Sequence, residues 1–295
     1  MDNIHLAPMK NISCWAFRNS FRHISNSYTE MLNLNSLLHK KQKASKLIDT
    51  YKIPNQNQWL QVLTHNLSDM NDLPNFIKEF QNKYPEKKYI YGINLNACCP
   101  DLGVIAAGDG AALIKRTKRL IDLFKIFLRA SSTDFLRISC KIRLGINLQE
   151  MKHNKVLNFI KELDNIDDDR ISPTIIHFRH AQQNSDSTPH WEIIEDLLNC
   201  DHKIIINGGI GSINDIHKIQ TYLSDNVREK WNERLSGIMI GKAVLKNPIC
   251  IESISNISKK KVSLKYWKDQ FIRGLKEHPP SYRFIKELNR TYQID

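Results

Sequence analysis

The order of short apolar segments is the feature of this sequence that most restricts its fold. Eight runs rich in β-branched or other apolar residues recur along the chain, and each is followed by a polar turn and a segment with helical spacing. The predicted strands are His5–Ala7, Ser27–Met31, Trp59–Thr64, Tyr89–Leu95, Arg137–Arg143, Thr174–His177, Lys203–Ile206 and Gly237–Ile240. Strands that alternate with helices pair in parallel, because each crossover returns the chain to the same end of the sheet.

Eight such units are typical of a (β/α)8 or TIM barrel, which takes roughly 250 residues. The predicted helices are Trp15–His23, His39–Tyr51, Leu73–Lys83, Ala111–Leu128, Leu148–Leu163, Trp191–Leu198, Ile213–Leu223 and a segment from Pro248 onward. A doubly wound open sheet is the alternative, but Pro8–Asn11 stands where its glycine-rich fingerprint would follow the first strand. We therefore predict an α/β fold, a TIM barrel over residues 1–250 with a short helical appendage over 251–295.

Composition and cysteine usage indicate a globular protein of a reducing compartment. Hydrophobic residues make up 41% of the chain and charged residues 25%, enough to bury a sizeable core. No apolar run approaches the roughly 18 residues of a membrane span, and Met1–Ile4 lacks the start of a signal peptide. The six cysteines show no metal-ligand spacing, and Cys98 and Cys99 are neighbours. We expect a cytoplasmic protein with no membrane association, no metal and no obligate protein partner.

The charge distribution predicts a polyanionic partner. The formal net charge is +12, and the segment Lys259–Asp295 contains ten Lys or Arg residues against four Asp or Glu. This basic tail also contains Tyr266, Trp267, Tyr282, Phe284 and Tyr292. Such a mixture can pack on the barrel through its aromatic rings while its cations face RNA phosphates, although a merely solvated surface is the alternative. A second basic run is Lys40, Lys41, Lys43 and Lys46.

The residues that end the predicted strands are the candidates for chemistry, since active sites of barrels lie at the carboxyl ends of their strands. The loops after strands seven and eight contain Asn207-Gly208-Gly209 and Gly241-Lys242. Backbone N–H groups at these two loops commonly bind phosphate, and glycine permits a close approach. A Lys141 side chain directed inward needs an electron-rich partner, and the Gln61 amide in its apolar strand needs hydrogen-bond partners.

Seven motifs at successive strand ends, from His5 to Pro248, together resemble the dihydrouridine synthases, FMN-dependent enzymes that reduce uridine in tRNA. The resemblance implies FMN as the cofactor, NAD(P)H as the reductant and tRNA as the substrate. It implies contacts to FMN from Pro8, Met9, Gln61, Lys141, His177, Asn207, Gly208, Gly209, Gly241 and Lys242. Lys141 would contact the N1 and O2 region of the flavin, where negative charge gathers on reduction.

The segment Asn96–Pro100 matches the family motif Asn-x-Gly-Cys-Pro. The resemblance implies Cys99 as the catalytic acid that protonates uracil C5, Asn96 as a contact to the uracil edge and Arg179 as a contact to the RNA or the target base. Cys98 stands where the family has glycine, so two adjacent thiols compete for the role of acid. The following loop, Asp101–Asp109, lacks the basic residue that relatives carry there.

Two other functions compete with this interpretation. The first is a flavin-dependent oxidoreductase acting on a free pyrimidine, similar to dihydroorotate dehydrogenases. Such a substrate would not require the basic tail. The second is a non-catalytic RNA-binding barrel with a degraded site, which Cys98 and the acidic loop make conceivable.

Overall fold

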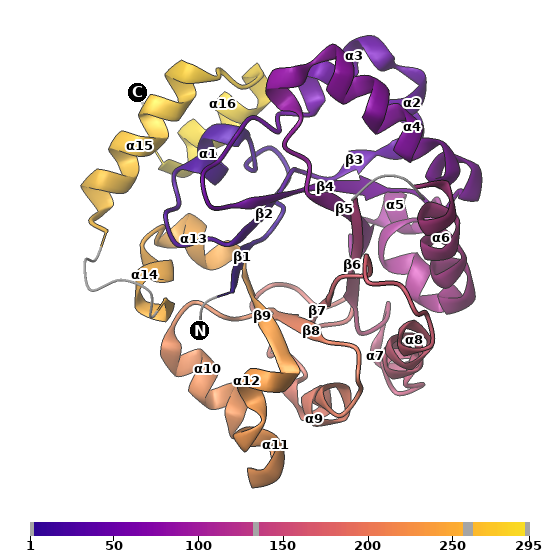
Figure 1. Cartoon of the computed structure of the whole chain (residues 1–295). Coiled ribbons are helices and arrows are strands. Elements are labelled where there is room, and N and C mark those ends of the chain that lie inside the picture. The colour runs from indigo at the N-terminus through magenta and orange to yellow at the C-terminus, as the bar shows by residue number, and fades with distance from the viewer. Residues whose placement is uncertain (1–2, 132–135, 256–261, 293–295) are drawn as a thin grey trace.

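The computed structural model describes residues 3–131, 136–255 and 262–292, and within them a parallel sheet closes into a barrel (Figure 1). The barrel strands are β1 (Ile4–Leu6), β2 (Asn26–Tyr28), β4 (Asn57–Leu63), β5 (Gly92–Ala97), β6 (Arg137–Arg143), β7 (Thr174–His177), β8 (Ile204–Asn207) and β9 (Leu235–Ile240). Neighbours in this order pair in parallel, and β1 closes the ring by pairing with both β2 and β9. The predicted TIM barrel is confirmed.

The second barrel position differs from its predicted form because the strand is interrupted. β2 pairs with the first half of β4, and a separate two-residue strand β3 (Leu32–Asn33) pairs with Val62 and Leu63 at its end. Thr29 and Glu30 lie in the interruption and are buried. The break therefore directs a carboxylate, Glu30, toward the carboxyl ends of the strands.

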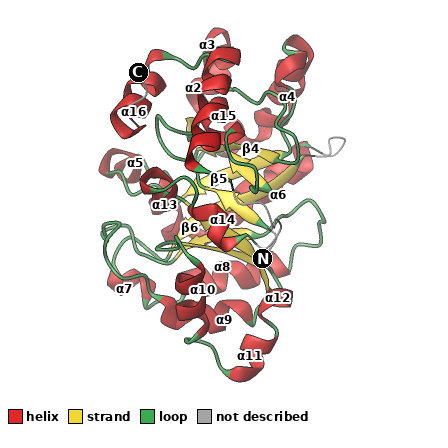
Figure 2. Ribbon diagram, turned by 90° about the vertical axis from the view of Figure 1, so that its left-hand side faces the viewer, coloured by secondary structure: helices red, strands yellow, loops and turns green. Residues whose placement is uncertain are grey.

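Helices surround the strands on the outside of the barrel, as Figure 2 shows. They are α1 (Trp15–Asn19), α2 (Leu34–His39), α3 (Lys41–Leu47), α4 (Leu67–Lys83), α5 (Leu102–Ala106), α6 (Thr117–Ala130), α7 (Leu148–Met151), α8 (Lys155–Asp164), α9 (Ile194–Leu198), α10 (Ile213–Gln220), α11 (Asp225–Glu229), α12 (Trp231–Arg234), α13 (Lys242–Lys246), α14 (Cys250–Ile254), α15 (Leu264–Glu277) and α16 (Tyr282–Tyr292), with short 3-10 helices at Pro85–Lys87, Gly110–Arg116 and Trp191–Ile193. Among the described residues, no helix has the length and apolar character to cross a membrane.

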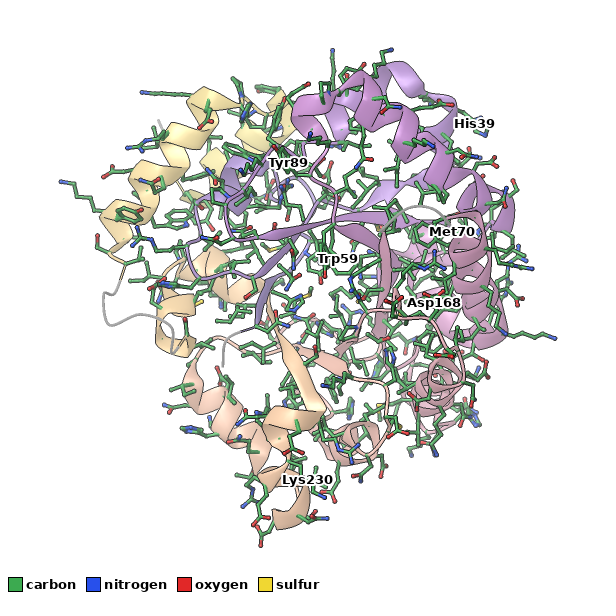
Figure 3. All side chains as sticks on the ribbon, viewed as in Figure 1. His39, Trp59, Met70, Tyr89, Asp168 and Lys230 are labelled. Carbon is green, nitrogen blue, oxygen red and sulfur yellow. The ribbon has the colours of Figure 1, made fainter. Side chains whose placement is uncertain are left out.

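Side chains fill the interior of the barrel. A buried cluster inside the barrel is made of Ala7, Tyr28, Trp59, Ile175, Ile205 and Met239. All of them lie on barrel strands except Ala7, which directly follows β1. Trp59 lies near the middle of the molecule in Figure 3, whereas His39 and Lys230 lie at its outer edge. This packed layer closes the barrel below its carboxyl end, so a ligand can enter only from the loops above it.

The last two helices pack against α1, which is too short to cover its side of the barrel alone. Trp267, Phe271, Phe284 and Leu288 are buried in the same core as the barrel helices. At the crossing, a Cβ on Gly274 would lie 3.1 Å from Ala16, so α15 approaches α1 as closely as a glycine allows. Tyr282 is 77% exposed and does not share this packing. The basic residues Lys259, Lys260 and Lys261 lie outside the described residues.

Candidate functional site

A cavity of about 1000 Å³ opens at the carboxyl ends of the strands. Every side chain or backbone segment predicted for the site lines it. These residues are Pro8, Met9, Gln61, Asn96, Cys99, Lys141, His177, Arg179, Asn207, Gly208, Gly209, Gly241 and Lys242. The barrel therefore brings together residues that are up to 234 positions apart in the sequence, although their individual roles stay predictions.

The lining of this cavity carries a surplus of positive charge. Its basic residues are Lys10, Lys141, Arg143, Arg179, Lys242 and Lys246, whereas its acidic residues are Asp186 and Asp215. Asp215 already accepts hydrogen bonds from the backbone N–H of Gly211 and the hydroxyl of Ser212. Cations gathered in a partly enclosed, low-dielectric space attract anions strongly. The cavity is suited to a ligand with negative charge.

A chain of buried amides forms the floor of the cavity. Asn96 Nδ2 donates to Gln61 Oε1 at 2.9 Å, and Gln61 Nε2 donates to Asn94 Oδ1 at 2.7 Å. Asn94 in turn donates to the hydroxyl of Ser139 at 3.4 Å. Each amide nitrogen carries a second hydrogen, so Gln61 and Asn96 keep donor capacity for a ligand above them. The network fixes the orientation of both amides across three neighbouring strands.

Asn96 also shapes the loop that carries the two adjacent thiols. Its Oδ1 accepts hydrogen bonds from the backbone N–H groups of Cys98 at 3.0 Å and Cys99 at 2.9 Å. The backbone N–H of Ala111 then donates to the Cys99 carbonyl oxygen at 3.1 Å. Cys98 has no positive φ, so the backbone accepts a side chain at the position where the family motif has glycine.

The two neighbouring thiols lie in opposite electrostatic surroundings. Burial raises the pKa of Cys99. Burial would also raise the pKa of Cys98, but the positive charges of Lys141 and Arg143 outweigh it, and the pKa of Cys98 is lowered. Lys141 Nζ donates to Cys98 Sγ at 3.1 Å. Cys99 thus keeps its proton at neutral pH, as an acid must, while Cys98 ionises more readily than an ordinary thiol.

The glycines after β8 lie beside a buried arginine. Gly208 and Gly209 have φ values of 117° and 70°, a conformation that side chains rarely adopt. A Cβ at Gly208 would lie 3.4 Å from one terminal nitrogen of Arg179, and a Cβ at Gly209 would lie 3.5 Å from the other. Within the described chain, the Arg179 side chain makes its one hydrogen bond from Nε to the Ser187 carbonyl oxygen at 2.6 Å. Its two terminal nitrogens therefore remain available beside the glycines.

His177 contributes a neutral ring with an unused nitrogen. Burial, reinforced by the charges of Lys141, Arg143 and Arg179, lowers the pKa of His177 well below its usual range. Its Nδ1 is buried and has no hydrogen-bond partner among the described residues. The His177 side chain is half-buried and lines the cavity, so its neutral ring can contact a ligand there.

Sequence reasoning missed several residues that line the cavity. Arg143 is the most informative, because its Nε donates to the Cys98 carbonyl oxygen at 2.9 Å and its guanidinium also holds His180. The alternation of side chains along a strand places residue 143 on the same face as Lys141, so this position could have been found. Ser185, whose hydroxyl accepts from Lys242 Nζ at 2.5 Å, lies in an irregular loop that leaves no such signal.

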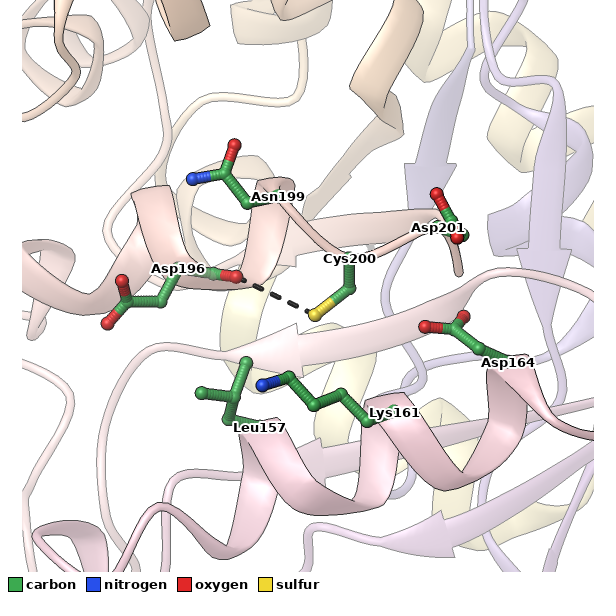
Figure 4. A pocket seen from close by; sticks show the side chains of 7 residues that line it. All are labelled: Leu157, Lys161, Asp164, Asp196, Asn199, Cys200 and Asp201. Atoms are coloured by element: carbon green, nitrogen blue, oxygen red, sulfur yellow. Dashed lines mark hydrogen bonds between the residues drawn. The ribbon is translucent and has the colours of Figure 1, made fainter.

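A second cavity, of about 360 Å³, lies between α8 and the end of α9 (Figure 4). Its lining is Leu157, Lys161, Asp164, Asp196, Asn199, Cys200 and Asp201, none of which was predicted for the site. The Cys200 thiol donates to the Asp196 carbonyl oxygen, at a sulfur-to-oxygen distance of 3.6 Å. This outer cavity does not reach the carboxyl ends of the strands.

The sequence is similar to one described family over nearly its whole length. Residues 5–290 match the family model described as dihydrouridine synthase (Dus), a range that includes the barrel and most of the α15–α16 pair. A probable tRNA-dihydrouridine synthase of Staphylococcus aureus (strain Mu50) is 28% identical over 204 residues, which are 69% of this chain and 57% of that protein.

Two yeast proteins are similar over shorter stretches. A tRNA-dihydrouridine(20) synthase (NAD(P)+) of Schizosaccharomyces pombe is 28% identical over 184 residues, 61% of this chain and 35% of the relative. A tRNA-dihydrouridine(47) synthase (NAD(P)(+)) of Debaryomyces hansenii is 30% identical over 118 residues, 39% and 18% of the two chains. The matches thus span little more than half the length of the Staphylococcus relative and about a third or less of the yeast proteins.

Proposed function

Because this chain belongs to the dihydrouridine synthase family, we propose that it reduces uridine in tRNA to 5,6-dihydrouridine, with FMN as cofactor and NAD(P)H as reductant. The observation that carries the proposal is the convergence of residues from seven separate strand ends on one cavity of about 1000 Å³. The names of the two yeast relatives, which include tRNA-dihydrouridine synthase and NAD(P), support the same substrate and reductant. We also expect a cytoplasmic location, consistent with six free cysteines.

The cavity fits FMN in three separate features. Gly208 and Gly209 with the Arg179 guanidinium beside them suit the phosphate. The neutral His177 ring in the cavity wall suits a polar edge of the flavin or its ribityl chain, and Lys141 suits the pyrimidine edge. When bound, FMN would supply the hydride that is added to the uracil ring.

This assignment moves Arg179 from the RNA toward the cofactor. The sequence resemblance implies a contact to RNA or the target base, yet the side chain is buried against the glycines of the phosphate loop. Guanidinium groups bind phosphate oxygens through two parallel hydrogen bonds. We therefore assign Arg179 to the FMN phosphate, with Lys242 as the more exposed second cation.

Cys99 would supply the proton that completes the reduction. Its thiol is half-buried at the cavity wall, and its raised pKa keeps it protonated at neutral pH. Asn96, held by the amide network, would contact the uracil edge. A uracil ring inside folded RNA must leave its stack to enter such a cavity, as other base-modifying enzymes require.

The test is a reconstituted reaction with purified protein. We expect flavin absorbance bands that NADPH or NADH bleaches, and a mass increase of two hydrogens at a uridine of unmodified tRNA. Free uridine offered at equal concentration should not be reduced, which separates this function from that of an oxidoreductase acting on free pyrimidines. Absence of flavin bands even after addition of FMN would contradict the proposal and favour a non-catalytic RNA-binding barrel.

A further inference from the structure

The contact between Lys141 and Cys98 is specific to this chain's departure from the family motif. Lys141 is 7% exposed and Cys98 is 5% exposed, and both line the cavity. Lys141 Nζ lies 3.1 Å from Cys98 Sγ. Within the described residues, the Lys141 ammonium makes this one hydrogen bond. The glycine of the family motif at this position could not provide such a partner, because it has no side chain.

The groups around the Cys98 thiol favour its negative form. Lys141 and Arg143 reach it from β6, and their charges outweigh the effect of burial on its pKa. The other titratable neighbours are Cys99, on the same loop, and Cys140, on β6, and burial raises the pKa of both thiols, which keeps them uncharged. Cys98 and the Lys141 ammonium therefore form a buried hydrogen-bonded pair in the wall of the cavity, in which the thiol ionises more readily than a free cysteine.

We propose that Cys98 is a positioning residue that holds the Lys141 ammonium in place and offsets part of its positive charge, so that the reduced form of bound FMN is stabilised less than by an unpaired lysine. The proposal rests on the proposed function, because it takes the cavity to be the FMN site. Reduced flavin carries more negative charge than oxidised flavin, so a fixed cation beside it favours the reduced form. Partial neutralisation of that cation makes the flavin a stronger reductant toward uracil.

The direct test measures the midpoint potential of FMN bound to the full-length protein and to two variants. Cys98→Ala should bind reduced FMN about tenfold more tightly relative to oxidised FMN, a rise of ~30 mV for a two-electron couple. Cys98→Ser should shift the potential in the same direction, because a serine hydroxyl can hold the ammonium but stays uncharged. The control is Cys200→Ser, which changes a thiol in the outer cavity and should leave the potential unchanged.

A second measurement needs no cofactor. The ultraviolet absorbance of the thiolate, followed against pH in the FMN-free protein, should show one thiol that ionises below the usual range, and Cys98→Ala should remove that signal. Lys141→Met should shift the same ionisation upward. The melting temperature of each variant establishes that the folded protein is being measured.

The outcomes separate the two proposals. Protein that binds no FMN contradicts the proposed function and, with it, the role of Cys98. Protein that binds FMN with the same potential in Cys98→Ala as in the unchanged chain overturns only the role of Cys98. An ionisation that Lys141→Met leaves in place also overturns it, because the thiolate then does not depend on the lysine.

Discussion

The mouth of the barrel and the α15–α16 pair differ in what they bury: polar groups at the mouth and aromatic rings in the helical pair. The mouth gathers cations and amides and leaves some of their hydrogen-bonding capacity unused, as at His177 Nδ1 and the terminal nitrogens of Arg179. The α15–α16 pair buries aromatic rings such as Phe271 and Phe284 and turns most of its charges to solvent. Unsatisfied polar groups lower stability and serve ligands, whereas buried rings raise stability.

The two regions should therefore respond to substitution in different measurements. A change at the mouth should appear in binding and catalysis with little loss of folding free energy, since the groups there are only partly paired without a ligand. A change in the buried face of the helical pair should appear in stability with little effect on the chemistry.

Removal of the proton donor should have the largest effect. Cys99→Ala should lose about 10² to 10⁴-fold in the rate of tRNA reduction, because a positioned acid contributes that much. The variant should still bind FMN and still oxidise NAD(P)H. Single-turnover assays with tRNA measure the reduction of uridine, and steady-state assays measure the oxidation of NAD(P)H. Cys200→Ala, in the outer cavity of Figure 4, is the matched control and should keep the full rate. Equal losses in the two variants would show that the effect of Cys99 is not chemical.

The helical pair should respond in stability instead. Trp267 is 2% exposed and packs against Phe21, Phe271 and Tyr292. Trp267→Ala should lower the free energy of unfolding by about 3–5 kcal/mol, as for other large buried rings, while the remaining folded protein binds FMN normally. Denaturant unfolding measures this loss of free energy. The control is Tyr282→Ala at an exposed position, which should change the free energy of unfolding by no more than about 0.5 kcal/mol. Loss of FMN affinity in folded Trp267→Ala would break the separation between the regions.

The sequence could predict the barrel because its strands are buried on both faces. Arg137–Arg143 and Thr174–His177 are predicted with the bounds that the structure shows, the first from alternating apolar residues and the second from a β-branched run. The interruption between Tyr28 and Leu32 was missed, because the polar pair Thr29-Glu30 is short and Met31 and Leu32 resume the apolar run. Helices α11 and α12 were missed since residues 225–234 are mostly charged or polar and show little helical periodicity.

The site could be predicted as a set of residues but not as a set of contacts. The motifs identified Lys141 and Cys99 as separate candidates. Because strand ends in a barrel share one rim, both could be assigned to the same site. The hydrogen bond from Lys141 to Cys98 depends on the register of β5 against β6, in which Asn96 is paired with Lys141. It also depends on the turn that Asn96 imposes on the thiol loop. Neither is encoded in local sequence patterns.

Loss of the buried guanidinium should weaken the binding of the cofactor phosphate. Arg179→Gln should reduce FMN affinity by roughly 10 to 100-fold, because a hydrogen bond to a charged group is worth about 1.5–3 kcal/mol. Riboflavin, which lacks the phosphate, should bind the variant and the unchanged protein equally well in fluorescence titrations. A loss for both ligands alike would return Arg179 to a structural role. An unchanged FMN affinity with weaker RNA binding would return it to the substrate.

Charge reversal on the exposed face of α15 should have a smaller effect, confined to RNA. Lys265, Lys268 and Arg273 are exposed while Trp267 and Phe271 hold the same helix to the core. Reversing all three charges should reduce the slope of log affinity for tRNA against log salt by about 0.7–0.9 for each phosphate that the helix no longer neutralises. NAD(P)H oxidation should not change. A slope that stays the same would place RNA on another face, for which Lys40 and Lys46 are the next candidates.

The smallest expected effect concerns an ion pair that joins the two regions. Arg283 of α16 donates to Glu30 Oε1, while Glu30 Oε2 accepts from the backbone N–H of Asn11 at 3.1 Å, in the loop that follows Met9. Glu30 is buried and Arg283 is about half exposed, so Arg283→Gln should cost about 1 kcal/mol of stability, near the upper limit for exposed pairs.

The same substitution should loosen the loop of Pro8 and Met9 and weaken FMN binding by a few-fold. The double variant Glu30→Gln with Arg283→Gln should recover part of both losses, because it no longer buries an unpaired carboxylate. Additive losses in that cycle would show that Arg283 acts on α16 alone. Recovery would establish that the helical pair, otherwise separate from the chemistry, holds one wall of the cavity through a buried carboxylate.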